Sequence, residues 1–279
     1  RHWIKNLLVF LAPLLAFQFN YEIWFAAFIS FLVFNLAASS IYLFNDIVDF
    51  NSDKVHPKKK FRPIASGKLS RNTALIISIS LMLSSLIISF KLNTSLFLII
   101  ILYIFIQIIY CLKLKKEPLL DIFSIAAGFL LRAIAGGFAS NLFISPWFIL
   151  SVGLLALFLA LEKRKAELRL YEVSGINTRK VLDKYSMPLL LRLESIVSTG
   201  SFMTYSLWAS GPALKGASTS WMLLTVPFVL MGIFRYQFLS DPSIREKQIY
   251  QDLYVDSENP VNIFLHDKGN NLKNLLNPL

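Results

Sequence analysis

Cysteine is nearly absent from the sequence, because Cys111 is the only one among 279 residues. A disulfide framework and a site built from several thiolate ligands are therefore both excluded. Cys111 lies within an apolar block, where we expect it to act as a small hydrophobic side chain. Histidine is also scarce, and His2, His56 and His266 lack the spacing typical of metal ligands, so we expect none of them to bind a metal.

Acidic residues are few as well: 17 Asp and Glu oppose 28 Lys and Arg, which gives a formal net charge of +11. A basic excess can indicate a nucleic-acid-binding protein, in which basic and aromatic residues share one polar domain. No such domain exists outside the apolar blocks, so we predict no nucleic-acid partner. Charge asymmetry across a lipid bilayer explains the basic excess better.

Long apolar blocks fill most of the chain, which is 55% hydrophobic and has a mean hydropathy of +0.57. Each block has about the 20 residues that a helix needs to cross a bilayer. The predicted spans are 4–19, 22–44, 73–90, 94–112, 119–139, 143–161, 186–209 and 219–239. Lipid-exposed strands would have to alternate polar and apolar residues, and these blocks do not. We therefore predict an all-α integral membrane protein, a single domain over 1–279 with eight transmembrane helices.

Lysine and arginine predict the orientation of these helices. With the N-terminus inside, 22 of the 28 fall in inside segments and two, Lys91 and Lys215, in outside segments. This distribution follows the positive-inside rule. We expect a multi-pass protein of the inner (plasma) membrane, with the N-terminus and the segments after residues 44, 112 and 161 on the cytoplasmic face. The polar segment 240–279 is predicted to be a cytoplasmic tail or an interfacial helix.

Three aspartates follow the second predicted helix at helical spacing. Asp46, Asp49 and Asp53 fall at i, i+3 and i+7, with Asn45 one turn before Asp49, so they share one face if the helix continues. Carboxylates on one stripe repel one another unless a cation lies among them. Oxygen ligands suit Mg²⁺, which is often coordinated by carboxylates and substrate phosphates together. A solvated helix face is the alternative. We favour a metal because ionisable groups at the end of an otherwise apolar helix are costly.

Basic residues follow these aspartates at once: Lys54, Lys58, Lys59, Lys60 and Arg62. They would attract the phosphates of a substrate bound through Mg²⁺. The run 58–60 on its own is better explained as an orientation signal and a contact to lipid headgroups. Together the two stretches predict a magnesium-diphosphate site at the cytoplasmic membrane face.

Further polar residues are predicted at the same face. Tyr110 and Lys113 end the fourth predicted helix, and Asp121 opens the fifth, where it could simply favour the helix dipole. Arg132 lies eleven residues further along almost the same helix face, where an arginine must face the bundle interior, a partner or a phosphate. Small residues around it, including Gly128, allow neighbouring helices to approach closely.

The sixth predicted helix ends in a basic stretch that contains Lys163, Arg164 and Glu167. Lys163 and Glu167 can form an i, i+4 pair on the helix surface. Arg164 is a better candidate for phosphate binding, because a guanidinium can grip two oxygens at once. Near the N-terminus, Lys5 is expected at the membrane edge, where an anionic lipid head would arrive.

The motif Asn45-Asp46-x-x-Asp49-x-x-x-Asp53, followed by Arg62-Pro63 and Gly67, resembles the UbiA superfamily of intramembrane prenyltransferases. Further segments resemble its branch of decaprenyl-phosphate phosphoribosyltransferases. These are Trp3-Ile4-Lys5-Asn6, His56-Pro57-x-Lys59-x-x-Arg62-Pro63-Ile64-Ala65-x-Gly67, Asp121 with Gly128-Phe129-x-Leu131-Arg132-Ala133-x-Ala135-Gly136-Gly137, Ser145-Pro146-Trp147-Phe148, Lys163-Arg164-x-Ala166-Glu167-Leu168 and Gly232-Ile233-Phe234-Arg235-Tyr236. The resemblance runs from the first residues to about residue 267. The aspartate motif alone identifies only the superfamily, whereas the later segments together are much more specific.

This resemblance implies helices around a central cavity that opens to the cytoplasmic face. The family usually has nine helices, and no ninth is recognisable after Asp267, so we expect a truncated or altered last helix. The implied reaction is the Mg²⁺-dependent transfer of 5-phosphoribose from phosphoribosyl pyrophosphate to a polyprenyl (decaprenyl) phosphate, with release of pyrophosphate, for cell-envelope polysaccharide synthesis.

The resemblance also implies roles for the residues above. Mg²⁺ would be held by Asn45, Asp46, Asp49 and Asp53. The catalytic residues would be Asp46, Asp49, Asp53 and Arg62. The substrate-binding residues would be Lys5, Asn45, Lys54, Lys59, Tyr110, Lys113, Asp121, Arg132, Lys163, Arg164 and Glu167. Among these, Lys163 and Arg164 would hold the sugar 5-phosphate, and Lys5 with Arg132 would guide the lipid phosphate.

Three alternatives make different predictions. A prenyltransferase acting on an aromatic acceptor predicts a second acidic motif after the sixth helix, where this chain has the basic segment 163–167. A CDP-alcohol phosphotransferase needs an Asp-Gly then Ala-Arg pattern that the chain lacks. A transporter, the non-enzymatic alternative, predicts polar residues at the membrane midplane or broken helices in paired halves, whereas the polar groups here collect at one face.

Overall fold

The computed structural model describes residues 3–55, 59–174 and 180–240. These residues are helical almost throughout and contain no strand, which confirms the predicted all-α fold. The chain divides into two compact units, residues 1–229 and 230–279, and a single domain over 1–279 stays a prediction. Lys58, the three histidines and residues 241–279 of the predicted tail lie outside the described part.

Each predicted span is largely helical. The first forms the 3₁₀ helix η1 (Trp3–Phe10) and the short α1 (Leu11–Leu15). The others are α2 (Tyr21–Val48), α4 (Arg71–Leu92), α5 (Thr94–Leu112), α6 (Leu120–Ala139), α7 (Pro146–Ser174), α8 (Met187–Ala209), and η6 (Ser220–Thr225) continued by α9 (Val226–Ser240). The connections carry the short helices α3 (Phe50–Val55), η2 (Lys59–Phe61), η3 (Leu114–Lys116), η4 (Lys180–Lys184) and η5 (Pro212–Leu214).

Six helices in the described part are long and apolar enough to cross a membrane: Tyr21–Val48, Arg71–Leu92, Thr94–Leu112, Leu120–Ala139, Pro146–Arg169 and Ser220–Ser240. Two predicted spans fall short of this standard. The first is divided between η1 and α1, and gives only the shorter apolar helix Trp3–Leu15. α8 is long enough, but its serines and threonines, together with Arg192 and Glu194, lower its hydropathy. The count of eight and the central cavity stay predictions.

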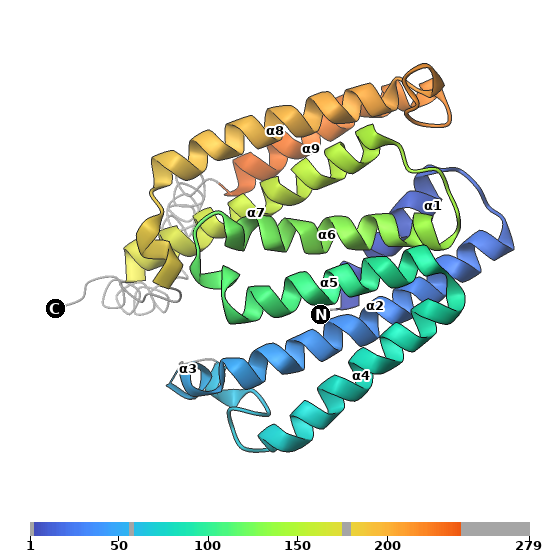
Figure 1. The fold of residues 1–279 in the computed structure, drawn as a ribbon. Helices are drawn as coiled ribbons and strands as arrows, with labels where there is room; N and C mark the ends of the chain where they lie inside the picture. The colour runs from blue at the N-terminus through green and yellow to red at the C-terminus, as the bar shows by residue number, and fades with distance from the viewer. Residues whose placement is uncertain (1–2, 56–58, 175–179, 241–279) are drawn as a thin grey trace, which may run out of the picture. The chain divides into compact units, whose positions relative to one another are not determined.

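Polar side chains mark where the helices begin. The Asn20 side-chain oxygen accepts a hydrogen bond of 3.1 Å from the Glu22 N–H at the start of α2. Asn93 accepts hydrogen bonds from two backbone N–H groups at the start of α5, and the same residue ends α4. An N-cap side chain satisfies donors that the start of a helix leaves unpaired. Asn93 does this for α5 and is also the residue at which α4 ends. The two helices therefore lie antiparallel and side by side (Figure 1).

The end of α2 keeps its helical hydrogen bonds into α3. α2 ends at Val48, but the Asp49 N–H donates to the Asn45 carbonyl at 2.9 Å. The Asp53 N–H then donates to the Asp49 carbonyl at 2.8 Å. The three aspartates therefore keep the spacing of a continuous helix across the junction.

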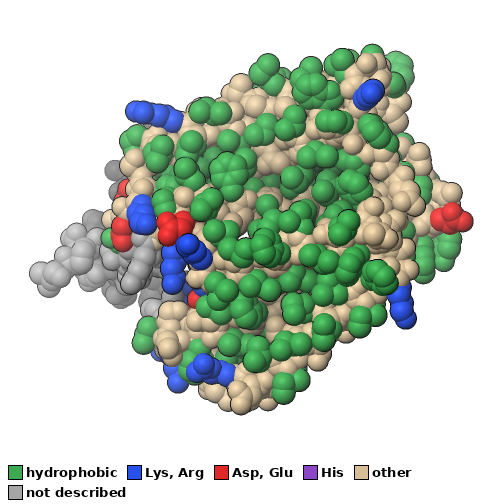
Figure 2. All heavy atoms as spheres, viewed as in Figure 1, with side chains coloured by type: hydrophobic (Ala, Val, Ile, Leu, Met, Phe, Trp, Pro, Cys, Tyr) green, Lys and Arg blue, Asp and Glu red, His purple; other side chains and the backbone are tan. Residues whose placement is uncertain are grey.

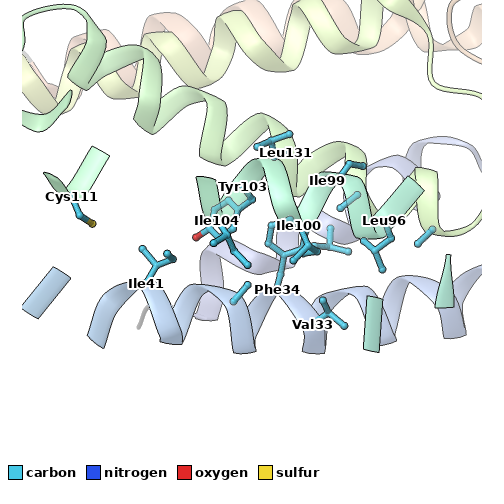
Figure 3. Packing of buried hydrophobic residues seen from close by; sticks show 14 residues of the cluster. Val33, Phe34, Ile41, Leu96, Ile99, Ile100, Tyr103, Ile104, Cys111 and Leu131 are labelled. Carbon is cyan, nitrogen blue, oxygen red and sulfur yellow. The ribbon is translucent and has the colours of Figure 1, made fainter. Parts of the chain in front are cut away.

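The core of the first unit forms where α2, α5 and α6 pack together (Figure 3). Phe34 of α2 meets Tyr103 of α5 edge to face, with ring centroids 5.2 Å apart. Leu131 of α6 joins this cluster, and Cys111 is buried in it as a hydrophobic side chain. α7 packs against α6 and α8 and extends the helical layers (Figure 1).

Two glycines on α6 allow η1 and α1 to approach closely. A Cβ atom on Gly136 would collide with the Val9 carbonyl oxygen, and one on Gly137 would lie 3.0 Å from the Ala12 Cβ. The close approach predicted for the small residues of this segment is therefore observed. It places the N-terminal helix directly on the backbone of α6.

Hydrophobic side chains cover most of the face shown in Figure 2, and charged side chains gather toward the helix ends. The segments after residues 44, 112 and 161 meet at one end of the first unit, where Lys115 contacts Asp49 and Lys184 lies 3.9 Å from Glu117. The predicted grouping of these segments is therefore observed. Their position on the cytoplasmic side stays a prediction.

Candidate active site

Arg62 joins two of the three aspartates. Its Nη1 atom lies 2.8 Å from Oδ1 of Asp46 and 2.8 Å from Oδ2 of Asp53. Asp53 is buried, and Asp46 and Arg62 are partly buried. Arg62 lies directly after η2. Two carboxylates one helical stretch apart thus converge on a single cationic nitrogen.

Lys115 forms an ion pair with the third aspartate, Asp49. Its Nζ atom lies 2.5 Å from Oδ1 of Asp49 and 3.5 Å from Oδ1 of Asn45. Lys115 belongs to η3, in the connection between α5 and α6, and sequence reasoning did not single it out. Lys113, which was predicted instead, is exposed. The only sequence signal was that several lysines follow α5.

The other residues predicted around the aspartates lie at different distances from them. Lys59 Nζ is 4.0 Å from Oδ1 of Asp53. The Lys54 ammonium lies over the Phe50 ring, 4.4 Å from its centroid, instead of beside a carboxylate. Tyr110 is partly buried and packs against the core of α2 and α5.

The donor set of this cluster fits Mg²⁺ chemically. Asn45, Asp46, Asp49 and Asp53 offer the hard oxygen ligands that Mg²⁺ prefers. As they stand, no three acidic, histidine or cysteine side chains in the described part are close enough together to hold a metal. Basic groups lie among the carboxylates, and the Arg62 nitrogen between oxygens of Asp46 and Asp53 occupies the kind of position that a cation takes.

A second polar cluster lies under the end of α7. Arg164 Nη2 lies 2.8 Å from Oδ2 of Asp121, its Nη1 pairs with Glu167, and both Arg164 and Asp121 are fully buried. The Tyr185 hydroxyl donates to Oδ1 of Asp121 at 2.6 Å and accepts from the Leu119 N–H at 2.6 Å. Burial and the hydrogen bond to Asp121 raise the pKa of Tyr185, which keeps the phenol neutral.

The predicted phosphate ligands at the end of α7 differ in access. The Arg164 guanidinium is enclosed by two carboxylates, whereas 52% of the Lys163 side chain is exposed and its ammonium lies 4.0 Å from Glu167. Only Lys163 therefore presents its cation to solvent. The next residue, Lys165, is buried between Glu162 and Glu194 and joins α7 to α8.

Arg132 faces the interior of the first unit. Its guanidinium donates to Oδ1 of Asn6 at 2.7 Å, to the Gly128 carbonyl at 2.6 Å and to the Tyr103 hydroxyl at 2.7 Å. The bundle interior was one of the three environments predicted for this arginine. The structure places it there, against neutral partners on η1, α5 and α6. Lys5 lies on the same helix as Asn6, 5.9 Å from the Phe129 ring centroid.

Known proteins are similar to this chain over most of its length. A model of the UbiA prenyltransferase family matches residues 7–251. The decaprenyl-phosphate phosphoribosyltransferase of Mycolicibacterium smegmatis is 40% identical over 249 residues, which cover 85% of this chain and 78% of that protein. The protein of the same name from Corynebacterium glutamicum is 38% identical over 245 residues, which cover 85% and 73%.

The fold is also similar to a solved structure, that of a UbiA homolog from Archaeoglobus fulgidus bound to GPP and Mg²⁺. The TM-score is 0.68 at 17% identity, and the match covers 85% of this chain and 83% of that one. At this identity the likeness concerns the fold alone. With its apolar helices and the family match over most of its length, the chain is a multi-pass membrane protein that belongs to the UbiA prenyltransferase family.

Proposed function

We propose that this protein transfers 5-phosphoribose from phosphoribosyl pyrophosphate to a polyprenyl phosphate and releases pyrophosphate. The observation that carries the proposal is the 40% identity to a decaprenyl-phosphate phosphoribosyltransferase across 85% of the chain. The basic end of α7 supports it further. A prenyltransferase acting on an aromatic acceptor would have a second acidic motif there, for a second metal, whereas this chain has Lys163 and Arg164. A donor with an additional phosphate on its sugar suits that charge.

The aspartate cluster is the proposed site for the leaving pyrophosphate. Asn45, Asp46, Asp49 and Asp53 would hold Mg²⁺. When bound, Mg²⁺ supplies Lewis-acid polarisation of the pyrophosphate and fixes its position. Arg62 and Lys59, which already lie beside the carboxylates, would neutralise the charge that develops on the leaving oxygen.

The sugar 5-phosphate is assigned to the end of α7. Lys163 presents an exposed ammonium there. Arg164 is buried between Asp121 and Glu167, so its role is to position the end of α7 rather than to contact the phosphate directly. This assignment places the pyrophosphate and the 5-phosphate of the donor at two different clusters, both at the same end of the first unit.

The acceptor is the phosphate of the lipid. One of its oxygens would attack the anomeric carbon of ribose while the bond from that carbon to the pyrophosphate oxygen breaks. A phosphate monoester is already ionised at neutral pH, so no general base is needed. Lys5 and Arg132 would attract this anion, and its hydrocarbon chain would lie among the apolar helices. The lysine and arginine distribution favours a cytoplasmic active site in the inner (plasma) membrane.

The test is a transfer assay with full-length protein in lipid vesicles. Phosphoribosyl pyrophosphate labelled in the ribose is incubated with decaprenyl phosphate, with and without Mg²⁺, and the lipid fraction is counted. We expect Mg²⁺-dependent labelling that falls at least about a hundredfold in Asp46→Asn. Asp183→Asn, an exposed aspartate of η4, is the matched control and should retain activity.

Two results would count against this function. One is an unlabelled lipid fraction from the intact protein, above all if a prenyl diphosphate and an aromatic acceptor give product instead. The other is undiminished labelling by Asp46→Asn, because the proposed metal ligand would then be dispensable.

A further inference from the structure

Lys115 reaches the aspartate cluster from a distant part of the chain. It is 66 residues from Asp49 in sequence, yet its ammonium lies 2.5 Å from the Asp49 carboxylate and 3.5 Å from the Asn45 side-chain oxygen. Only 14% of its side chain is exposed, so the charge is held largely out of solvent. One ammonium therefore contacts two of the four oxygen donors assigned to Mg²⁺.

Arg62 contacts the other two donors, Asp46 and Asp53, through one nitrogen. The four proposed ligands are thus divided into two pairs, and each pair is held by a basic residue from a different connection. In the described part, no three of the acidic side chains lie around a common point where they could hold a metal.

A divalent cation and these basic groups compete for the same oxygens. An ammonium in contact with a carboxylate oxygen would lie close to a metal bound to that oxygen, and like charges at such a distance repel strongly outside bulk water. Binding of the metal and contact with Lys115 are therefore mutually opposed, and the coupling is reciprocal.

We propose that Lys115 is an internal counter-ion of the metal site, which holds Asn45 and Asp49 while the metal is absent and is displaced when a divalent cation binds. After displacement, its ammonium remains tethered to η3 beside the cluster and is available to the pyrophosphate group of the donor substrate. The inference rests on the metal site of the proposed function. Removal of the charge then has two opposite effects: the metal binds more tightly, and the pyrophosphate substrate binds more weakly.

The test measures Mn²⁺ binding, through the electron paramagnetic resonance signal of free Mn²⁺, on the full chain in lipid nanodiscs without substrate. We expect Lys115→Met to bind Mn²⁺ at least about fivefold more tightly than the unmodified protein. Lys116→Met is the matched control, because Lys116 is exposed on the same turn, and it should leave Mn²⁺ affinity unchanged. In the transfer assay, KM for phosphoribosyl pyrophosphate should rise in Lys115→Met and not in Lys116→Met.

Lys115→Arg keeps the charge and guards against an effect of side-chain shape, so it should bind Mn²⁺ like the unmodified protein. If Asp49→Asn weakens Mn²⁺ binding but Lys115→Met leaves it unchanged or weaker, the counter-ion role is overturned and the metal site stands. Tighter binding by Lys115→Arg would also overturn the role. If Mn²⁺ binding to the unmodified protein does not depend on Asp49, the proposed metal site itself fails.

Discussion

The hydroxyl of Tyr185 donates a hydrogen bond of 2.6 Å to the carboxylate of Asp121, from which it is separated by 64 residues in the sequence. The same hydroxyl accepts the N–H of Leu119, a non-glycine residue with φ of +66°. Leu119 is the centre of a tight turn in which the Leu120 N–H donates to the Pro118 carbonyl at 2.8 Å. Such γ-turns with positive φ are rare and strained, so Tyr185 stabilises both a strained helix start and a buried carboxylate.

Tyr185→Phe should destabilise the protein by about 1–3 kcal/mol, because Oδ1 of the buried Asp121 carboxylate loses its hydrogen-bond donor and the Leu119 N–H loses its acceptor. Thermal unfolding in detergent measures this change. Tyr171→Phe is the control, since Tyr171 is partly buried and packs against the same hydrophobic cluster as Tyr185. Equal unfolding temperatures for the two variants would contradict the role of the hydroxyl.

The stabilising effect of the Tyr185 hydroxyl should depend on pH only in the alkaline range. The pKa of Tyr185 is raised in the folded protein above the usual value near 10. A raised pKa means that folding favours the protonated phenol, so its stabilisation is complete below about pH 10 and is lost as the pH rises further. The stability difference between the unmodified protein and Tyr185→Phe should therefore be the same at pH 7 and pH 9. A difference that shrinks between these values would show that the hydroxyl ionises earlier.

Arg62→Met should lower stability without metal and recover part of it with Mg²⁺. Removal of the guanidinium takes away the cationic nitrogen that lies between the Asp46 and Asp53 carboxylates, and a divalent ion can replace that charge. Unfolding temperatures measured with chelator and with Mg²⁺ test this expectation. Arg71→Met, which removes an exposed arginine lying over the Phe50 ring, should show no metal-dependent recovery. Recovery of the same size in both variants would argue against the bridging role.

Local patterns predicted more of this molecule than long-range ones. The spacing of Asp46, Asp49 and Asp53 was readable because helical hydrogen bonds continue past the end of α2, and the apolar spans were readable because the bilayer fixes their length. Lys115 was missed because the choice between it and Lys113 depends on how η3 turns after α5. Tyr185 was missed because its partner lies on another helix, and nothing in the neighbouring sequence indicates that contact.

Arg132→Met should be strongly destabilising, by at least about 2 kcal/mol, because Asn6 and Tyr103 would each lose a hydrogen-bonding partner in the interior. Thermal unfolding is again the measurement. Arg192→Met provides the control, because Arg192 is an exposed arginine on α8 and should be replaceable at little cost. If Arg132→Met kept its stability and lost only transfer activity, the role of Arg132 in holding η1 against α5 and α6 would be contradicted, and its proposed attraction of the acceptor phosphate alone would stand.

Gly136→Ala tests whether the position of η1 on α6 matters for the reaction. The new methyl group would meet the Val9 carbonyl oxygen, so η1 must shift away and carry Lys5 and Asn6 with it, at a cost of about 1–3 kcal/mol or more. Gly153→Ala is the matched control, because its Cβ would lie 3.7 Å from Leu130, an ordinary contact, and should stabilise α7 by up to about 1 kcal/mol. Unfolding temperatures and KM for decaprenyl phosphate are compared in both variants. If Gly136→Ala matched Gly153→Ala in both measurements, η1 would be free to move without consequence, and the assignment of Lys5 to the lipid phosphate would lose its structural basis.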